Sequence, residues 1–187
     1  SLEETANARI SFIKGHDYQA AYRLTRECVR QGHCKIVFLT FLFDCLGLDE
    51  RVRGFCAATE EVGIAKQCKI ITAKELSFEA VKQAFADCQH EFSLVLGSDD
   101  RIACFALRIL TEQGRKIPEE VSVIGWNNSR FLEYLTLPLA SVSIPMKKIG
   151  YRAAQIILKN LTEGPTVSKE YIDEQFVVRE SFAPFQS

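Results

Sequence analysis

Several chemistries are missing from this sequence of 187 residues. Its three histidines, His16, His33 and His90, have no metal-ligand spacing with one another, so a zinc site is not expected. The sequence contains no nucleophile elbow, no Walker-type phosphate loop and no glycine fingerprint for dinucleotides. We therefore expect a protein that is not an enzyme and that needs neither a metal nor a cofactor.

Long apolar runs and blocks of like charge are missing as well. No apolar run approaches the roughly 20 residues that a helix needs to cross a bilayer, and no secretion signal opens the chain. The formal net charge is −1, and lysines and arginines form no stripe. A chain without a basic surface is not expected to bind nucleic acid by itself.

Disulfide pairing is not indicated, although the chain has seven cysteines. They are scattered singly, without a Cys-x-x-Cys pair, and an odd number does not suit a disulfide framework. Reduced thiols within helices and strands are the better interpretation, which favours a cytoplasmic protein. The cysteines are Cys28, Cys34, Cys45, Cys56, Cys68, Cys88 and Cys104.

What is present is an ordinary globular composition, with 47% apolar and 25% charged residues, and a regular alternation of strand and helix patterns. This alternation predicts a doubly wound α/β fold with a mostly parallel sheet. Strands are predicted at residues 9–13, 35–43, 68–72, 92–96, 121–125, 141–144 and 175–178. Helices are predicted at residues 17–31, 49–62, 78–88, 99–113 and 145–161.

The ends and inner faces of several helices can be predicted from single residues. Asp17 and Ser77 are suited to cap the helices that follow them, and Gly32 to stop the first helix. The strand at 35–43 is apolar throughout, so it is expected to be buried on both faces. In the helix that follows Pro145, the spacing predicts an inward apolar face. That face comprises Ile149, Ala153, Ile156 and Ile157.

Polar residues follow four of the predicted strands. They lie at residues 43–44, 72–75, 97–100 and 126–128, where parallel strands present their carboxyl ends to ligands. Amides, hydroxyls, carboxylates and the Trp126 indole meet there. Such a set suits a neutral polar ligand, as sugars and nucleosides are.

Each of these residues also has a structural interpretation. Asp99 is better explained as a helix cap than as a ligand contact, which leaves Ser98 to face the cleft. Asn127 suits a turn as well as a ligand, and Phe78 is by default a core residue. One of Arg51 and Arg53 is expected on a solvated helix face, and the other could offer its fixed donor fork to a ligand.

The order of motifs resembles the effector-binding core of lactose-repressor-type (LacI/GalR) bacterial transcription regulators. The similar segments cover about residues 16 to 181. They are Gly-His-Cys-Lys-Ile-Val-Phe-Leu at 32–39, Arg-Val-Arg-Gly-Phe at 51–55, Leu-Gly-Ser-Asp at 96–99, Ala-Leu-Arg at 106–108, Ile-Pro-Glu-Glu-Val-Ser-Val-Ile-Gly at 117–125, and Val-Val-Arg-Glu-Ser at 177–181.

The resemblance implies a set of effector contacts and two departures from the family pattern. The implied contacts are Arg51, Phe78, Ser98 and Asn127, with Met146 as a weaker member. The resemblance thus selects Arg51 over Arg53. Asn127 stands where the family usually has Asp, and His16-Asp17 where it usually has Asp-Asn, so the effector can differ from a simple hexose.

The resemblance also implies a periplasmic-binding-protein-like architecture of two lobes with the effector between them. Residues 9–43 and 141–161 would form part of the first lobe, and residues 44–140 and 162–182 the second. The first lobe would be incomplete, and the DNA-binding helix-turn-helix would be absent from this chain. Operator DNA would be bound through that missing N-terminal domain, within a homodimer.

Two other functions share this architecture. A periplasmic sugar-binding protein has the same fold, but single cysteines and the lack of a secretion signal disfavour it. A doubly wound enzyme is the third interpretation, and no catalytic constellation supports it. The expected function is therefore that of a sugar- or nucleoside-responsive regulator.

Overall fold

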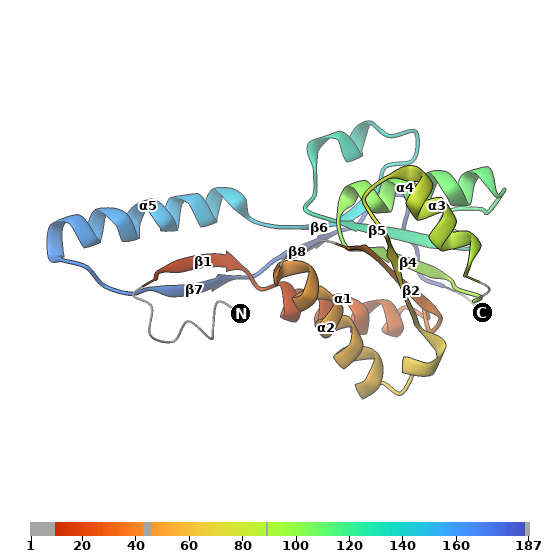
Figure 1. Cartoon of the computed structure of the whole chain (residues 1–187), viewed down its shortest axis with the longest axis horizontal. Coiled ribbons are helices and arrows are strands. Elements are labelled where there is room, and N and C mark those ends of the chain that lie inside the picture. The colour runs from red at the N-terminus through yellow and green to blue at the C-terminus, as the bar shows by residue number, and fades with distance from the viewer. Residues whose placement is uncertain (1–9, 43–45, 89, 186–187) are drawn as a thin grey trace.

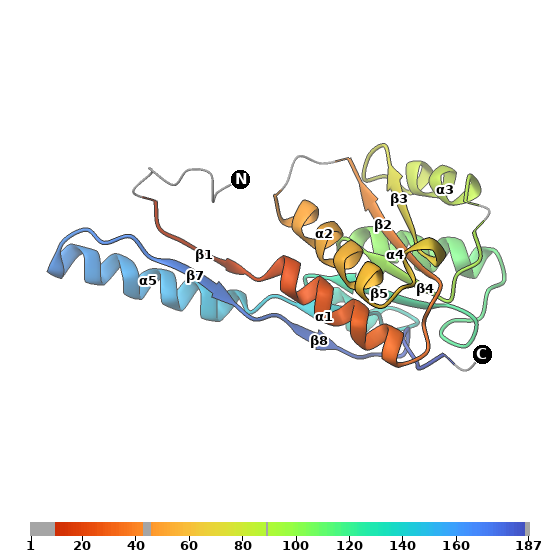
Figure 2. The same cartoon turned by 90° about the horizontal axis from the view of Figure 1, so that it is seen from below.

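Most of the chain forms one open sheet with helices on both faces, from which a smaller part extends (Figures 1 and 2). This arrangement is seen in a computed structural model that describes residues 10–42, 46–88 and 90–185. The predicted doubly wound α/β fold is confirmed.

The helices and strands alternate along the chain as the sequence predicts. The helices are α1 (Asp17–Arg30), α2 (Leu46–Glu61), α3 (Phe78–Ala86), α4 (Asp100–Glu112) and α5 (Met146–Glu163), with short 3-10 helices η1 (Ala65–Gln67) and η2 (Arg130–Tyr134). The strands are β1 (Phe12–Gly15), β2 (Ile36–Phe41), β3 (Lys69–Ala73), β4 (Leu94–Gly97), β5 (Ser122–Trp126), β6 (Ala140–Ser143), β7 (Lys169–Ile172) and β8 (Gln175–Val177).

Two sheets are present in the described residues. The larger has the order β3-β2-β4-β5-β6-β8, with β8 antiparallel to β6 and every other pairing parallel. The smaller consists of β1 and β7, which run parallel. It lies beside α5, at a distance from the larger sheet (Figure 2).

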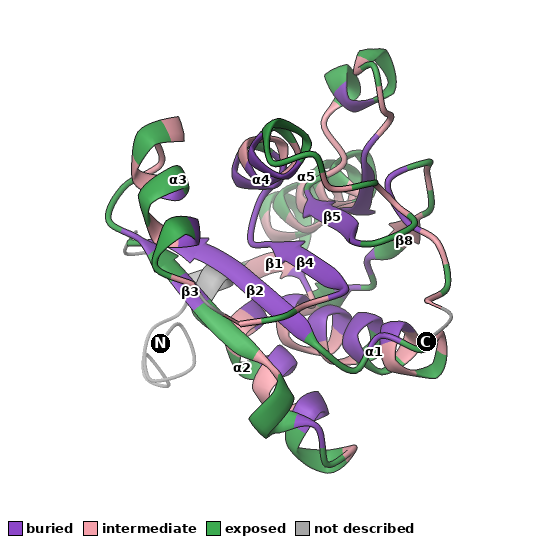
Figure 3. Ribbon diagram, turned by 90° about the vertical axis from the view of Figure 1, so that its right-hand side faces the viewer, coloured by how far each residue is buried: buried purple, intermediate pink, exposed green. Residues whose placement is uncertain are grey.

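Strand β2 shows why the larger sheet is covered on both faces. All six of its residues are buried, as predicted for this apolar run (Figure 3). Val37 and Leu39 pack with residues of α3 and α4, whereas Ile36 and Phe38 pack with residues of α1 and α2. Because side chains alternate along a strand, a continuous apolar run supplies both layers of the core.

Local capping is predicted correctly at Ser77 and wrongly at Asp17. Ser77 Oγ accepts a hydrogen bond from the Ala80 N–H at 3.2 Å. Asp17, by contrast, is the first residue of α1, its N-cap position is occupied by His16, and its carboxylate is bonded to Arg51. The Asp17 side chain, which the local pattern predicts to cap the helix, forms a buried ion pair with Arg51 instead.

The predicted inward face of α5 is only half-buried, since Ile149, Ala153 and Ile156 are of intermediate exposure and Ile157 is exposed. No residue of α5 is buried, and Ile157 and Leu161 are 59% and 78% exposed. The sequence also did not predict β7, whose pairing with β1 forms the small sheet. Two short strands offer too little surface to cover an 18-residue helix.

The predicted division into lobes is wrong for residues 17–41. They form α1 and β2, and β2 pairs with β3 and β4 in the larger sheet. The chain passes between the two sheets at three places, namely between β1 and α1, between β6 and α5, and between β7 and β8. The expected crossing near residue 43 lies next to residues outside the described ranges, and the strand before it, β2, belongs to the larger sheet.

Candidate ligand site at the carboxyl edge of the larger sheet

Arg51 connects the carboxyl ends of several strands. Its Nε donates to Asp17 Oδ1 at 2.7 Å, and its Nη1 donates to the Ser98 carbonyl at 2.6 Å. Its guanidinium carbon lies 4.7 Å from the centroid of the Trp126 ring. Because Arg51 is only 7% exposed and its fork is fixed by these partners, it is a rigid donor at this edge.

Arg51 retains donor capacity beyond these contacts. Among the described residues, its Nη2 forms no hydrogen bond, although Nε and Nη1 are both engaged. Nη2 is also not one of the fully enclosed polar atoms that lack a partner. The arrangement can therefore present the two N–H donors of Nη2 to an incoming ligand.

The polar residues of the turn between β4 and α4 have different roles. Asp99 caps α4, because its Oδ1 accepts from the Ile102 N–H at 3.0 Å, as the sequence predicts. Ser98 is fully buried, and its Oγ has no hydrogen-bond partner among the described residues. A buried hydroxyl without a partner is costly, so Ser98 is suited to a ligand or a water.

Asp100 fixes the loop that follows β5, a role that the sequence did not predict. Its Oδ1 accepts from Ser141 Oγ at 2.6 Å, and its Oδ2 accepts from the Ser129 N–H at 2.7 Å. Burial raises the pKa of this carboxyl above its usual value, while the bonds from both serines oppose the rise. Two adjacent acids after a strand were the only signal in the sequence.

Gly125 makes this packing feasible. A Cβ at this position would lie 2.6 Å from Asp100 Oδ1, closer than real Cβ atoms come. The glycine of this strand end is thus required by the buried carboxylate beside it.

Both asparagines after β5 adopt positive φ angles, 102° at Asn127 and 53° at Asn128. Asn is among the few residues that tolerate this region, so Asn127 adopts the turn conformation that was one of its two expected roles, and Asn128 does so as well. Asn128 Oδ1 accepts from Arg179 Nη2 at 2.8 Å. The Asn127 side chain is exposed and makes no hydrogen bond within the described part of the chain, so its amide remains available.

Trp126 is not the ligand platform that the sequence suggested. It is 1% exposed, and its indole N–H donates to Glu174 Oε2 at 2.7 Å. One face of the ring is occupied by the Arg51 guanidinium. The indole therefore packs against the Arg51 guanidinium and helps to fix its position.

Phe78 and Met146 do not join the Arg51 group. The Phe78 ring packs edge-on to Phe105 at 5.9 Å and lies 4.1 Å from the Arg108 guanidinium carbon. These contacts place it between α3 and α4, with a core role. Met146 begins α5 and is 66% exposed. The structure thus brings Arg51 and Ser98 into contact. Asn127 is the residue that follows Trp126, which packs against Arg51.

A hollow of about 250 Å³ opens near the start of α2. Its lining includes the His16 ring, which lies 4.7 Å from the Tyr171 ring, and the exposed Arg53, which lies over Tyr18. The lining residues are His16, Tyr18, Glu50, Arg53 and Tyr171. Arg53 is therefore the solvated arginine of the pair, as one of the two was expected to be.

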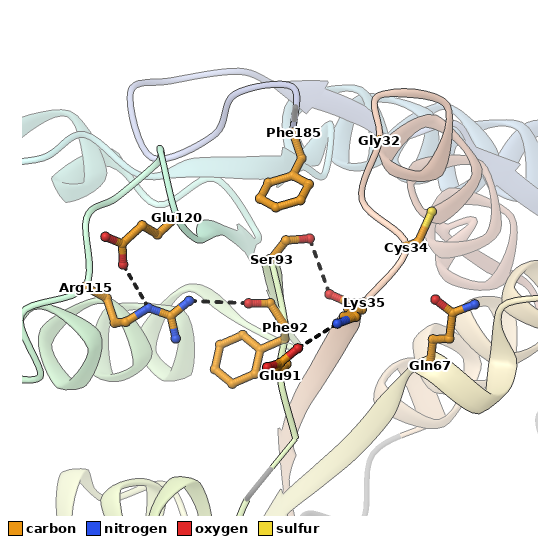
Figure 4. A pocket seen from close by; sticks show the side chains of 10 residues that line it. All are labelled: Gly32, Cys34, Lys35, Gln67, Glu91, Phe92, Ser93, Arg115, Glu120 and Phe185. Carbon is orange, nitrogen blue, oxygen red and sulfur yellow. Dashed lines mark hydrogen bonds and ion pairs between the residues drawn. The ribbon is translucent and has the colours of Figure 1, made fainter. Parts of the chain in front are cut away.

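A larger hollow of about 560 Å³ lies at the opposite edge of the sheet (Figure 4). Two ion pairs border it, Lys35–Glu91 at 2.7 Å and Arg115–Glu120 at 3.2 Å. Their residues precede β2, β4 and β5. Since open α/β sheets bind ligands beyond the carboxyl ends of their strands, the edge that holds Arg51 is the better candidate, although this hollow lies elsewhere.

Within residues 10–42, 46–88 and 90–185, no group of three His, Cys, Asp or Glu side chains could hold a metal ion. In the same ranges, no helix is both long and apolar enough to span a bilayer. Residues 43–44, part of one predicted strand end, lie outside the described residues.

Comparison with known proteins assigns the fold to a family. A model of the periplasmic binding protein-like domain matches residues 25–182. The chain belongs to the periplasmic binding protein-like family. This match spans the whole larger sheet and the extension formed by α5 and β7.

Curated relatives of this periplasmic binding protein-like chain are transcriptional regulators, and the predicted resemblance to LacI/GalR-type regulators is confirmed. The HTH-type transcriptional repressor PurR of Vibrio vulnificus is 28% identical over 148 residues, which are 78% of this chain and 44% of the relative. The regulator GalR of Escherichia coli is 27% identical over 145 residues, or 76% of this chain and 42% of the relative. The chain thus spans less than half the length of these relatives.

A solved structure supports the same fold. The LacI family transcriptional regulator from Enterococcus faecium, solved with bound ribose, superposes with a TM-score of 0.84 and 22% identity. The match covers 96% of this chain and 68% of that structure.

Proposed function

We propose that this chain is the effector-binding region of a LacI/GalR-like transcriptional regulator. The observation that carries the proposal is the rigid Arg51 at the carboxyl edge, bonded to Asp17 and to the Ser98 carbonyl, with Nη2 unbonded among the described residues. Ligands of open α/β folds bind at this edge. The proposed effector contacts are Arg51, Ser98 and Asn127. Phe78 and Met146, which the resemblance also implies, have less support from the geometry.

The ligand class is argued from charge and hydrogen bonding. Arg51 is already neutralised by Asp17, while Ser98 Oγ and the Asn127 amide offer neutral donors and acceptors. Such a set recognises hydroxyl groups better than a full negative charge. A sugar or a nucleoside is therefore the proposed effector, and one structural neighbour of the chain was solved with ribose.

The proposed regulation needs more protein than this chain. The effector would sit between two lobes and bind one lobe arrangement more tightly, which shifts a homodimer between DNA-competent and incompetent states. Reversing a 99:1 population requires about a 10⁴-fold preference. Operator DNA would be contacted by an N-terminal domain outside this chain, and the uncovered α5 supports a first lobe completed by further residues.

A regulator of this kind would act in the cytoplasm, as a binding protein and not as an enzyme. Its curated relatives act as transcription regulators, which supports both points. A periplasmic sugar-binding protein of the same fold is the second candidate. The coding sequence upstream discriminates between them, since a helix-turn-helix supports the regulator and a signal peptide the transport protein.

The test is a thermal-shift and calorimetric titration of the full-length protein with ribose and adenosine as probes. A ligand that binds only the folded state, at a free concentration of 100 times its Kd, raises the free energy of unfolding by about 2.7 kcal/mol. We expect one probe class to bind and Arg51→Lys to weaken that binding at least 10-fold, because Lys lacks the planar fork. The matched control is Arg30→Lys, at a 74% exposed side chain at the end of α1. Absence of binding by a broad sugar and nucleoside panel, or unchanged affinity in Arg51→Lys, would refute the proposal.

A further inference from the structure

Glu174 occupies one of the three places where the chain passes between the two sheets. It lies between β7 of the small sheet and β8 of the larger one. Its carboxylate presses against Gly15, which ends β1 at another of these passages, so closely that a Cβ on Gly15 would collide with Glu174 Oε1. One acidic side chain thus touches two of the connections between the sheets.

The two carboxylate oxygens have unequal surroundings. Oε2 accepts the Trp126 indole N–H at 2.7 Å, whereas Oε1 is buried and has no hydrogen-bond partner among the described residues. Glu174 as a whole is 9% exposed. An ionised carboxylate with one unpartnered oxygen is unfavourable in such a place, because burial disfavours the charged form.

Charged groups on two neighbouring helices act on Glu174 in opposite directions. The Asp17 carboxylate of α1 repels it, while Arg51 of α2 and Arg23 of α1 favour its charge. Arg23 is engaged by Asp173 at 2.7 Å, and Arg51 by Asp17. Burial, followed by the repulsion from Asp17, raises the pKa of Glu174 to about 7.

Trp126 connects Glu174 to the proposed effector site. Its N–H points to the carboxylate, and its ring face lies 4.7 Å from the Arg51 guanidinium carbon. With Glu174 protonated, Arg51 and Asp17 form a neutral pair beside a neutral acid. With Glu174 ionised, the group carries one net negative charge, and two carboxylates share one arginine.

We propose that Glu174 is a proton switch at the junction of the two sheets, and that its ionisation changes how Arg51 is held. Asp17, Arg23 and Arg51 are the charged side chains that act on it directly, and Glu27 lines the 180 Å³ hollow behind it. The consequence for effector binding rests on the proposed function, but the switch itself does not. Loss of the proton sends it to solvent and leaves a carboxylate that competes with Asp17 for Arg51.

The direction of the pH effect follows from the raised pKa. An unfolded Glu titrates near 4.3, whereas Glu174 in the folded protein titrates at about 7, so the folded state holds the proton more strongly. The stabilisation from this proton is complete below the unfolded pKa and is lost as pH rises through 7. Both forms of Glu174 are populated near neutral pH.

Trp126 provides a direct readout because it is the only tryptophan of the chain. Its fluorescence is recorded from pH 5.5 to 8.5 for wild type, Glu174→Gln and the control Glu180→Gln, which replaces an exposed glutamate three residues beyond β8. We expect a one-proton transition near pH 7 in wild type and in the control, and none in Glu174→Gln. A transition that persists in Glu174→Gln, or no transition in wild type, overturns the proposal.

A second measurement guards against poor folding of Glu174→Gln. In wild type with ¹³C-labelled glutamate carboxyls, one resonance should titrate near pH 7. Asp17→Asn should move that midpoint downward, because it removes a repelling charge. If all glutamates titrate below pH 5.5, the switch does not exist.

The effector consequence is measured separately on the full-length protein. If ribose binds, its affinity at pH 6 and pH 8 should differ at least threefold in wild type and stay within error in Glu174→Gln. If no probe binds, the proposed function fails, while the fluorescence and resonance titrations still decide on the switch.

Discussion

At the residue scale, two adjacent acids after β4 have separate functions. Asp99 satisfies a free N–H at the start of α4, whereas Asp100 turns inward and accepts bonds from Ser141 and Ser129. The first role can be read from local sequence, since acids are common helix caps. The second needs partners 29 and 41 residues away and appears only in the folded chain.

We predict that Asp100→Ala lowers the free energy of unfolding by about 2–3 kcal/mol, because it leaves one buried and one part-buried donor without acceptors. Chemical denaturation followed by circular dichroism would measure this loss. Asp87→Ala, at an exposed aspartate that ends α3, should change stability by less than about 0.5 kcal/mol. Equal stability of wild type and Asp100→Ala would show that the loop after β5 is held by other contacts.

At the element scale, α1 and α2 pack closely enough to need a glycine. A Cβ on Gly54 of α2 would collide with the Tyr18 carbonyl and come within 3.0 Å of the Ala21 Cβ. The two helices thus approach each other at their backbones, and this brings Arg51 to Asp17. Gly150 of α5, in contrast, has no atom within 4 Å of where a Cβ would lie.

These two glycines give a matched pair of substitutions. Gly54→Ala should destabilise the protein by about 1–3 kcal/mol, because overpacking outweighs the gain in helix propensity. Gly150→Ala should stabilise α5 by up to about 1 kcal/mol, because only the propensity term remains. Thermal unfolding of both variants is the measurement. Changes of the same sign in the two would contradict this account of the α1–α2 contact.

At the scale of the whole molecule, the chain has one well-covered sheet and one uncovered extension. The small sheet and α5 project beyond the larger sheet (Figure 1), and α5 has no buried residue. Its exposed apolar side chains include Tyr151, Ile157, Leu158 and Leu161. A cluster of this kind on a monomer usually marks a surface that another part of a protein covers.

We expect this 187-residue chain on its own to bind an apolar dye such as ANS and to self-associate. Leu158→Lys combined with Leu161→Lys should reduce both signals, whereas the control Lys159→Gln should not, since it leaves the apolar residues in place. Light scattering and dye fluorescence provide the measurements. In the full-length protein we expect little dye binding, and strong binding there would mean that α5 stays uncovered.

Much of the fold could be predicted because its signals are local. The apolar run of β2, the Ser77 cap and the positive-φ glycine at position 32 each specify their own surroundings. The burial of the α5 face was overestimated, because periodicity shows that a helix has an apolar side but not how much of the protein lies against it. The lobe boundary near residue 43 was wrong because the sequence of a strand does not show which other strands it pairs with. Strand β2 pairs with β3 and β4.

For the candidate site, the sequence by itself determined the residue types at the strand ends and therefore the chemistry on offer. It also led to Arg51 and Ser98, through the order of the family motifs. Only the tertiary structure decided that Trp126 is buried under Arg51, that Phe78 packs against α4, and that Glu174 faces Gly15. The reason is physical: capping and strand burial depend on neighbours in sequence, whereas ion pairs and buried carboxylates depend on residues that meet only when the sheets assemble.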